Sequence, residues 1–338
     1  MTAAQWLLIL AWSGLTLYAL LGGADFGGGF WDALAGGARR GYAQRRLIEH
    51  SIGPVWEANH VWLIFVLVMF WTCFPGVFAS VASTLYIPLT LVAIGIIARG
   101  AAFAFRKAST ELWQLRLFGG AFALSSVVTP FFLGAVAGGV ASGRVPYGLA
   151  AGDLVSSWWN PTSLMAGALA VGTTAYLAAV YLTGDARRGG DERLAGAFRL
   201  RGLVTAVVTG AIALGGLFVV RADAPALYAG LTGRALPLVL VSGVAGLASM
   251  ALLAARRYVP ARGTAALAVA AVLWGWAVAQ YPVMLPPDVT VSEAAAHPAV
   301  LRATLVTVIL GMVLLVPSLL WLFAIFQRSP ARRAATKE

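Results

Sequence analysis

The chain has 338 residues, of which 60% are hydrophobic and only 11% are charged, and its mean hydropathy is +0.84. A soluble fold could not bury that much apolar surface, so the composition indicates a protein that crosses a membrane several times. The net charge is +11, but the basic residues fall in short clusters between apolar runs, which excludes a nucleic-acid-binding domain.

Nine apolar runs are each long enough to cross a bilayer as a helix, which takes roughly twenty residues. In chain order, the runs are 5–24, 54–73, 77–105, 117–140, 161–182, 200–220, 235–255, 264–285 and 300–326. The third run is long enough to tilt or to extend past the bilayer. Asn160 and Pro161 predict the start of the fifth helix, as N-cap and first helical residue. The sequence therefore predicts an all-α integral membrane protein that forms one polytopic domain.

The positive charges predict which side of the membrane each connection faces. Of the 24 Lys and Arg, 19 fall in or beside the connections after the odd-numbered runs and in the C-terminal tail, and 4 fall in the other connections. Because cytoplasmic loops carry the excess of Lys and Arg, we predict the N-terminus outside and the C-terminus in the cytoplasm. No Lys or Arg precedes Arg39, so the first run lacks the basic segment of a cleavable signal peptide and is predicted to be a retained helix.

Few ionisable residues fall inside the runs, and they are predicted to share one depth near the cytoplasmic face. Glu57, Asn59 and His60 open the second run, Asp25 follows the first, and Arg99 lies near the end of the third. An ionisable group in a membrane is costly and either pairs or serves a pathway. Two interpretations stay open: a buried salt bridge from Arg99 to Asp25 or Glu57, and a water-linked carboxylate relay for protons from the cytoplasm.

These residue types do not favour a metal or haem site in this chain. Glu57 and His60 form one Glu-x-x-His pair, whereas di-iron bundles use two such pairs and two further glutamates. Only His60 of the three histidines lies inside a run. Cys73 is the single cysteine, which excludes an intrachain disulfide and a multi-cysteine metal site in this chain alone. The glycines within 22–29 match no nucleotide-binding motif. They predict close helix approach and a helix break that would expose Asp25 to cytoplasmic water.

Two motifs give the chain a close resemblance to a known family. They are Gly-Gly-Ala-Asp-Phe-Gly-Gly-Gly at 22–29 and Ser-Ile-Gly-Pro-Val-Trp-Glu-Ala-Asn-His-Val-Trp-Leu-Ile at 51–64. With them the chain resembles subunit II of cytochrome bd-type quinol oxidases, and the second motif resembles the cyanide-insensitive branch. The resemblance extends over nearly the whole length through these further segments: Phe74-Pro75, Arg99 with Arg106, Trp159-Asn160-Pro161, and Tyr281-Pro282 with Pro286.

The resemblance implies a reaction, a fold and partners. Such oxidases sit in the prokaryotic cytoplasmic (inner) membrane and reduce O2 to water with electrons from ubiquinol or menaquinol, taking protons from the cytoplasm. The haem-bearing subunit I holds two b haems, one d haem and the quinol site, and subunit II binds no haem of its own. A structural quinone or lipid and a small accessory subunit are further candidates. The implied fold is two four-helix bundles, one in 1–140 with the polar cluster and one in 141–338, which also holds a peripheral C-terminal helix.

The resemblance also assigns roles to individual residues. Asp25 and the carboxylate at position 57 match residues proposed to line a proton path towards subunit I. Position 57 is often Asp in other members, so Glu57 keeps the negative charge on a longer side chain. Some relatives have Gln in place of His60, which argues against an obligatory ligand there. Arg99 is expected to orient and tune the carboxylates, and Asn59 and His60 complete the polar cluster.

Two alternatives to an oxidase subunit stay open. One is a proton-coupled secondary transporter that uses the same acidic cluster, and the other is a purely structural subunit. Transporters usually have paired broken helices at the bilayer midplane in both halves. In this sequence the polar cluster lies in the first third, with nothing comparable in the last four runs.

Overall fold

The computed structural model describes residues 1–37, 39–52, 56–109 and 111–327, and most of them are helical. The helices are α1 (Ala3–Ala33), α2 (Tyr42–Ile52), α3 (Trp56–Cys73), α4 (Pro75–Thr84), α5 (Tyr86–Ala108), α6 (Leu112–Ala141), α7 (Pro161–Arg188), α8 (Glu192–Asp223), α9 (Pro225–Thr232), α10 (Leu236–Ala254), α11 (Tyr258–Gln280), α12 (Val291–Ala294) and α13 (Pro298–Gln327). The strands β1 (Val283–Leu285) and β2 (Val289–Thr290) pair antiparallel. Within these described ranges, nine helices are long and apolar enough to span a membrane: α1, α3, α5, α6, α7, α8, α10, α11 and α13. The predicted all-α membrane fold is confirmed.

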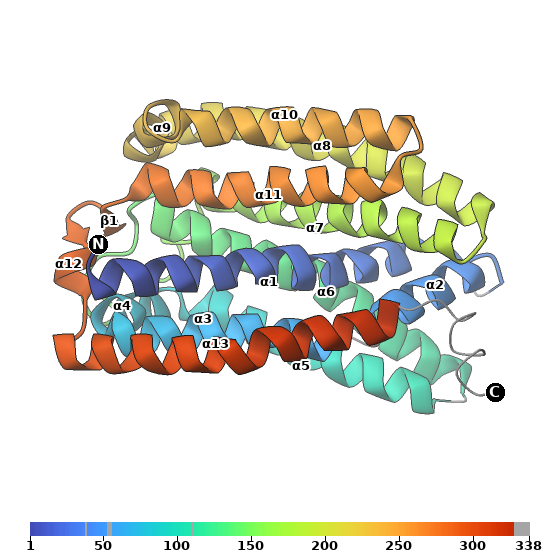
Figure 1. Ribbon diagram of the computed structural model, residues 1–338, viewed down its shortest axis with the longest axis horizontal. Helices are drawn as coiled ribbons and strands as arrows, with labels where there is room; N and C mark the ends of the chain where they lie inside the picture. The colour runs from blue at the N-terminus through green and yellow to red at the C-terminus, as the bar shows by residue number, and fades with distance from the viewer. Residues whose placement is uncertain (38, 53–55, 110, 328–338) are drawn as a thin grey trace.

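The spanning helices run roughly along one direction (Figure 1). Helix α1 packs against α3, α6 and α7, while α8 and α10 lie along one side of the molecule and α13 lies against α1 and α3. The connections α1–α3, α5–α6, α7–α8 and α10–α11 gather at one end, where α2 lies, and we call this the cation-rich end. Which membrane face it meets stays a prediction. The division into two bundles also stays a prediction, and helices α1 and α6 pack against α7 across it.

Two details of the predicted helix boundaries can be compared with the structure. The third apolar run is divided between α4 and α5, and Pro88 falls in the first turn of α5, where its missing N–H costs no helical hydrogen bond. The predicted start of the fifth span is confirmed, because the side chain of Asn160 accepts a hydrogen bond from the backbone N–H of Ser163 at 2.9 Å. Two predicted segments lie outside the described residues: Gly53 to Val55 of the second motif, and the cationic tail at 328–338.

The predicted helix break around Asp25 is wrong, because α1 is continuous through the glycine-rich segment. A Cβ atom at Gly27 would overlap the main-chain carbonyl of Thr174 on α7, and one at Gly29 would overlap the side chain of Ser126 on α6. The glycines therefore permit close helix approach, as the sequence suggested, and that packing offsets their low helix propensity. As a result, α1 carries Asp25 into the interior instead of exposing it.

Candidate functional site

Asp25 lies inside the protein between α1 and α3. Its exposed fraction is 4%, and that of Asn59 on α3 is 2%. The side-chain amide of Asn59 donates a hydrogen bond from Nδ2 to Oδ2 of Asp25 at 2.8 Å. A buried carboxylate in a membrane segment is costly, so its partners are the first clue to its function.

Arg99 of α5 is as deeply buried as Asp25 and links three helices. Its Nη2 donates to the main-chain carbonyl of Asp25 at 2.9 Å, and its Nε donates to the hydroxyl of Ser126 on α6 at 3.3 Å. The guanidinium carbon lies 4.8 Å from the ring centre of Phe26 and 5.0 Å from that of Phe122. These contacts supply both hydrogen-bond acceptors and ring faces to the buried charge. Arg99 therefore holds α1, α5 and α6 together near Asp25.

Glu57 does not join this cluster. Its side chain is exposed, whereas that of Asn59, two residues along α3, is buried. Residues two apart on a helix do not share a face, so the contact of Asn59 with Asp25 turns Glu57 to the outside. None of the ion pairs among the described residues joins Arg99 to Glu57 or to the carboxylate of Asp25. The structure thus brings Asp25, Asn59 and Arg99 together and places Glu57 on the outer surface.

His60 is half-buried and surrounded by aromatic rings. Its Nδ1 lies 3.0 Å from the main-chain carbonyl of Trp56, and its ring centre lies 5.8 Å from those of Tyr18 and Trp56 and 6.0 Å from that of Phe26. The imidazole is therefore packed among three aromatic rings on two helices. No group of three or more His, Cys, Asp or Glu side chains suited to a metal ion occurs in the described part of the chain.

The sequence reasoning missed a second buried acid, Asp32. It lies seven residues after Asp25, on the same face of α1 and about 10 Å further along the axis. Its carboxylate forms ion pairs with Arg45 of α2 at 3.1 Å and with Arg106 of α5 at 2.8 Å, and its exposed fraction is 4%. The spacing was a usable signal, but the first helix was predicted to end at residue 24, which left Asp32 in a loop.

The fold and this site define a polytopic helical membrane protein in which α1, α3, α5 and α6 surround an acid, an amide and an arginine. Proteins of this class use buried acids for helix packing or for proton movement. The family model for cytochrome bd terminal oxidase subunit II matches residues 3–326. The chain belongs to that family, as its motifs predicted.

Relatives and a solved structure agree with this assignment. The putative cytochrome bd menaquinol oxidase subunit II of Bacillus subtilis (strain 168) is 24% identical, with 94% of each chain aligned. The cytochrome bd ubiquinol oxidase subunit 2 of the same strain is 32% identical over 35% of this chain and 34% of that protein. The cytochrome bd-I ubiquinol oxidase subunit 2 of Escherichia coli (strain K12) is 28% identical over 58% of this chain and 50% of that protein, so these last two alignments span half of the relative or less. The structure of bd oxidase from Geobacillus thermodenitrificans has the same fold, with a TM-score of 0.77, 24% identity, and coverage of 97% of this chain and 99% of that one.

Proposed function

We propose that this chain is subunit II of a bd-type terminal oxidase, which reduces O2 to water with electrons from a quinol. Membership of the subunit II family over residues 3–326 is the observation that carries the proposal. The chain pairs with a haem-bearing subunit I, which supplies two b haems, one d haem and the quinol site. The complex lies in the prokaryotic cytoplasmic membrane, and the cation-rich end faces the cytoplasm. The relatives are named for ubiquinol or menaquinol, so we assign only the quinol class.

The exposed side chains on the outer face of α3 support the proposal that a partner subunit covers this face. Glu57, Val61, Ile64, Val68 and Trp71 are all exposed and follow one another at helical spacing, so they form a single stripe. A carboxylate at the head of an apolar stripe would be costly against lipid tails. A partner subunit that covers this stripe would supply polar groups to Glu57 and apolar surface to the other four side chains.

The contacts of Asp25 support a role in proton delivery. Its carboxylate accepts one hydrogen bond from Asn59, and Arg99 bonds its main-chain carbonyl, which leaves carboxylate oxygen capacity for a proton. Two buried atoms, the hydroxyl of Tyr18 and Oδ1 of Asn59, have no hydrogen-bond partner among the described residues. Buried polar atoms are normally satisfied by protein or water, so this pair favours hydration beside Asp25. In our proposal, Asp25 takes up protons from the cation-rich end and Glu57 passes them to subunit I.

The substitution Glu57→Gln in the co-purified heterodimer tests this role. Glutamine keeps the size and the hydrogen-bonding capacity of the side chain but cannot carry a proton. We expect quinol-driven O2 consumption to fall by about tenfold or more, because a positioned proton-transfer group contributes at least that much. The reduced-minus-oxidised haem spectrum should be unchanged. The matched control is Glu111→Gln, an exposed carboxylate at the cation-rich end, which should leave both readouts at the wild-type level.

Other outcomes would favour the alternatives. If Glu57→Gln lost its haems or its partner subunit, a purely structural subunit would be the better interpretation. If the wild-type complex gave no haem spectrum, the oxidase proposal would fail and a proton-coupled secondary transporter would replace it. The continuous α1 counts against a transporter, since such proteins usually bind their substrates at broken helices.

A further inference from the structure

Tyr18 carries a buried hydroxyl that no hydrogen bond from a described residue satisfies. The side chain belongs to α1, and its exposed fraction is 4%. Its hydroxyl oxygen is enclosed by this chain and has no hydrogen-bond partner among the described residues. A phenylalanine would fill the same space without an unmet polar group, whereas an unpaired hydroxyl inside a membrane-spanning bundle is costly. Neither lipid nor a partner subunit reaches an enclosed atom, so a ligand of this hydroxyl has to be a small molecule inside the protein.

The ring of Tyr18 is directed along α1 towards Asp25. A Cβ atom added at Gly22 would lie 2.9 Å from Cε2 of the ring and 3.6 Å from Cζ, the carbon that bears the hydroxyl. Residue 22 is about one turn further along the helix than residue 18, and Asp25 follows within the next turn. The glycine leaves room for the ring to lie against the helix. This direction brings the hydroxyl towards the buried cluster around Asp25.

Members of that cluster lie close to the Tyr18 side chain. The phenol is within electrostatic range of Asp25 and of Arg99. Its ring centre lies 5.8 Å from that of His60 on α3, in an edge-to-face contact. The preceding residue on α3, Asn59, donates to the Asp25 carboxylate and has a second buried atom without a partner, Oδ1. A hydroxyl and an amide oxygen are thus both unmet near one carboxylate.

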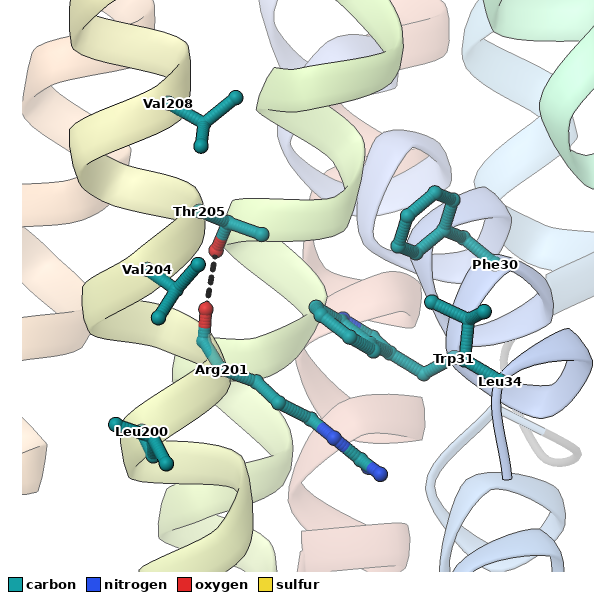
Figure 2. A pocket seen from close by; sticks show the side chains of 8 residues that line it. All are labelled: Phe30, Trp31, Leu34, Leu200, Arg201, Val204, Thr205 and Val208. Carbon is teal, nitrogen blue, oxygen red and sulfur yellow. Dashed lines mark hydrogen bonds between the residues drawn. The ribbon is translucent and has the colours of Figure 1, made fainter. Parts of the chain in front are cut away.

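Arg201 shows how a buried donor can be stabilised without a ligand. Its Nη1 also has no hydrogen-bond partner among the described residues. The guanidinium carbon lies 5.1 Å from the ring centre of Trp31 and 4.9 Å from that of Phe198, and Figure 2 shows the side chain extending beneath the indole. These ring faces attract the cation. A neutral hydroxyl gains much less from a ring face, so the Tyr18 hydroxyl needs a hydrogen-bonding partner.

We propose that Tyr18 is a positioning residue of the proton path and that its hydroxyl holds one internal water beside Asp25. The water accepts a hydrogen bond from the Tyr18 hydroxyl and donates one to Oδ1 of Asn59, which satisfies both unmet atoms. The inference rests on the proposed function, in which protons pass from Asp25 to Glu57. Because Asp25 is buried and Glu57 is exposed, a proton that passes between them needs a carrier.

The water supplies that carrier in a balanced step. Protonated Asp25 gives its proton to the water oxygen, and the water releases one of its own protons towards Glu57. The carboxylate is then ready to accept the next proton from the cation-rich end. The phenol keeps its proton throughout, so Tyr18 orients the water and is not itself a carrier.

The substitution Tyr18→Phe in the co-purified heterodimer tests this role, because it removes one oxygen atom and keeps the ring. We expect kcat for quinol-driven O2 consumption to fall by about fivefold or more, since a relay depends on the position of each group along it. The KM for quinol and the haem content should be unchanged. In infrared difference spectra, the carboxyl band that Asp25→Asn removes should shift in Tyr18→Phe. The matched control is Tyr176→Phe, which removes a buried hydroxyl that donates to Ser249 at 2.6 Å and should leave kcat and the band unchanged.

The possible outcomes distinguish a failure of this role from a failure of the proposed function. Wild-type kcat or an unchanged Asp25 band in Tyr18→Phe would refute the positioning role, even where Asp25→Asn is slow. Equal slowing by Tyr176→Phe would show a general effect of losing a buried hydroxyl and would refute it as well. If Tyr18→Phe fails to assemble, a high-resolution structure of the wild-type complex decides, because a hydroxyl without water density within hydrogen-bond distance would overturn the proposal. Wild-type turnover in Asp25→Asn would instead remove the proposed function itself.

Discussion

Replacing Asp25 by asparagine separates the proton role of the site from its structural role. The two hydrogen bonds of Arg99 end on the main-chain carbonyl of residue 25 and on Ser126, so neither uses the carboxylate. Asparagine has the same shape as aspartate, and its amide oxygen can still accept the hydrogen bond of Asn59. The substitution therefore removes the exchangeable proton and the charge but leaves the contacts between helices in place.

The expected change in stability follows from those contacts. A hydrogen bond to a charged group contributes about 1.5–3 kcal/mol and a neutral one about 0.5–1.5 kcal/mol, so Asp25→Asn weakens the bond from Asn59 by about 1 kcal/mol. The lost attraction to Arg99 is offset by no longer burying a carboxylate, and the guanidinium keeps its two hydrogen bonds and two ring contacts. In contrast, Arg99→Met removes two hydrogen bonds and two ring contacts and leaves a buried carboxylate without a counter-charge, which costs about 3–5 kcal/mol.

Thermal unfolding, haem spectra and quinol-driven O2 consumption of the heterodimer measure these effects. For Asp25→Asn we expect a small shift in the thermal midpoint, an unchanged haem spectrum and turnover lower by about tenfold or more. For Arg99→Met we expect a much lower midpoint or loss of the partner subunit. Wild-type turnover in Asp25→Asn would refute the proton role. Destabilisation of Asp25→Asn as large as that of Arg99→Met would show that the carboxylate is mainly structural.

Three further substitutions test helix packing and one ion pair. Gly27→Ala should destabilise the complex by about 1–3 kcal/mol in the thermal assay, because its Cβ would overlap a main-chain carbonyl of α7 that cannot rotate away. The control is Gly210→Ala, where a Cβ meets nothing within 4 Å. This substitution should be neutral or stabilising in the same assay. Asp223 pairs with Arg144 through both carboxylate oxygens at the end of α8 remote from the cation-rich end, so Asp223→Ala should lower stability by about 1–3 kcal/mol. Its turnover per haem should stay at the wild-type value, and a loss of turnover at full haem content would contradict this purely structural role.

Hydropathy was enough to predict the spanning helices, because each needs a long apolar run and little else. It failed where packing, and not apolarity, keeps the chain helical. The segment from Gly22 to Asp32 contains five glycines and two acids, so its composition is typical of a loop. Contacts with α2, α6 and α7 bury it and keep it in α1. Those contacts join residues far apart in sequence, and local pattern cannot reveal them.

The sequence predicted the depth in the bundle that the polar residues share, but not the contacts between them. Charge distribution and topology placed Asp25, Glu57 and Arg99 near one end of the bundle. The sequence could not predict how α3 is rotated about its own axis, because that helix is apolar on nearly every face and has no polar side that would indicate which face is exposed. The contact of Asn59 with Asp25 fixes this rotation, and it turns Glu57 outward. The pairing of Arg99 with a main-chain carbonyl likewise depends on atomic positions.

The two buried acids of α1 differ in their partners more than in their burial, and this difference supports Asp25 over Asp32 as the proposed proton carrier. Asp32 forms ion pairs with both Arg45 and Arg106, so its charge is compensated and its protonation would break two links between helices. Asp25 accepts one amide hydrogen bond, and the nearby guanidinium bonds its backbone. Gaining or losing a proton there disturbs no ion pair among the described residues. A group that must change its charge on each turnover needs that freedom, whereas an anchor between helices needs the opposite.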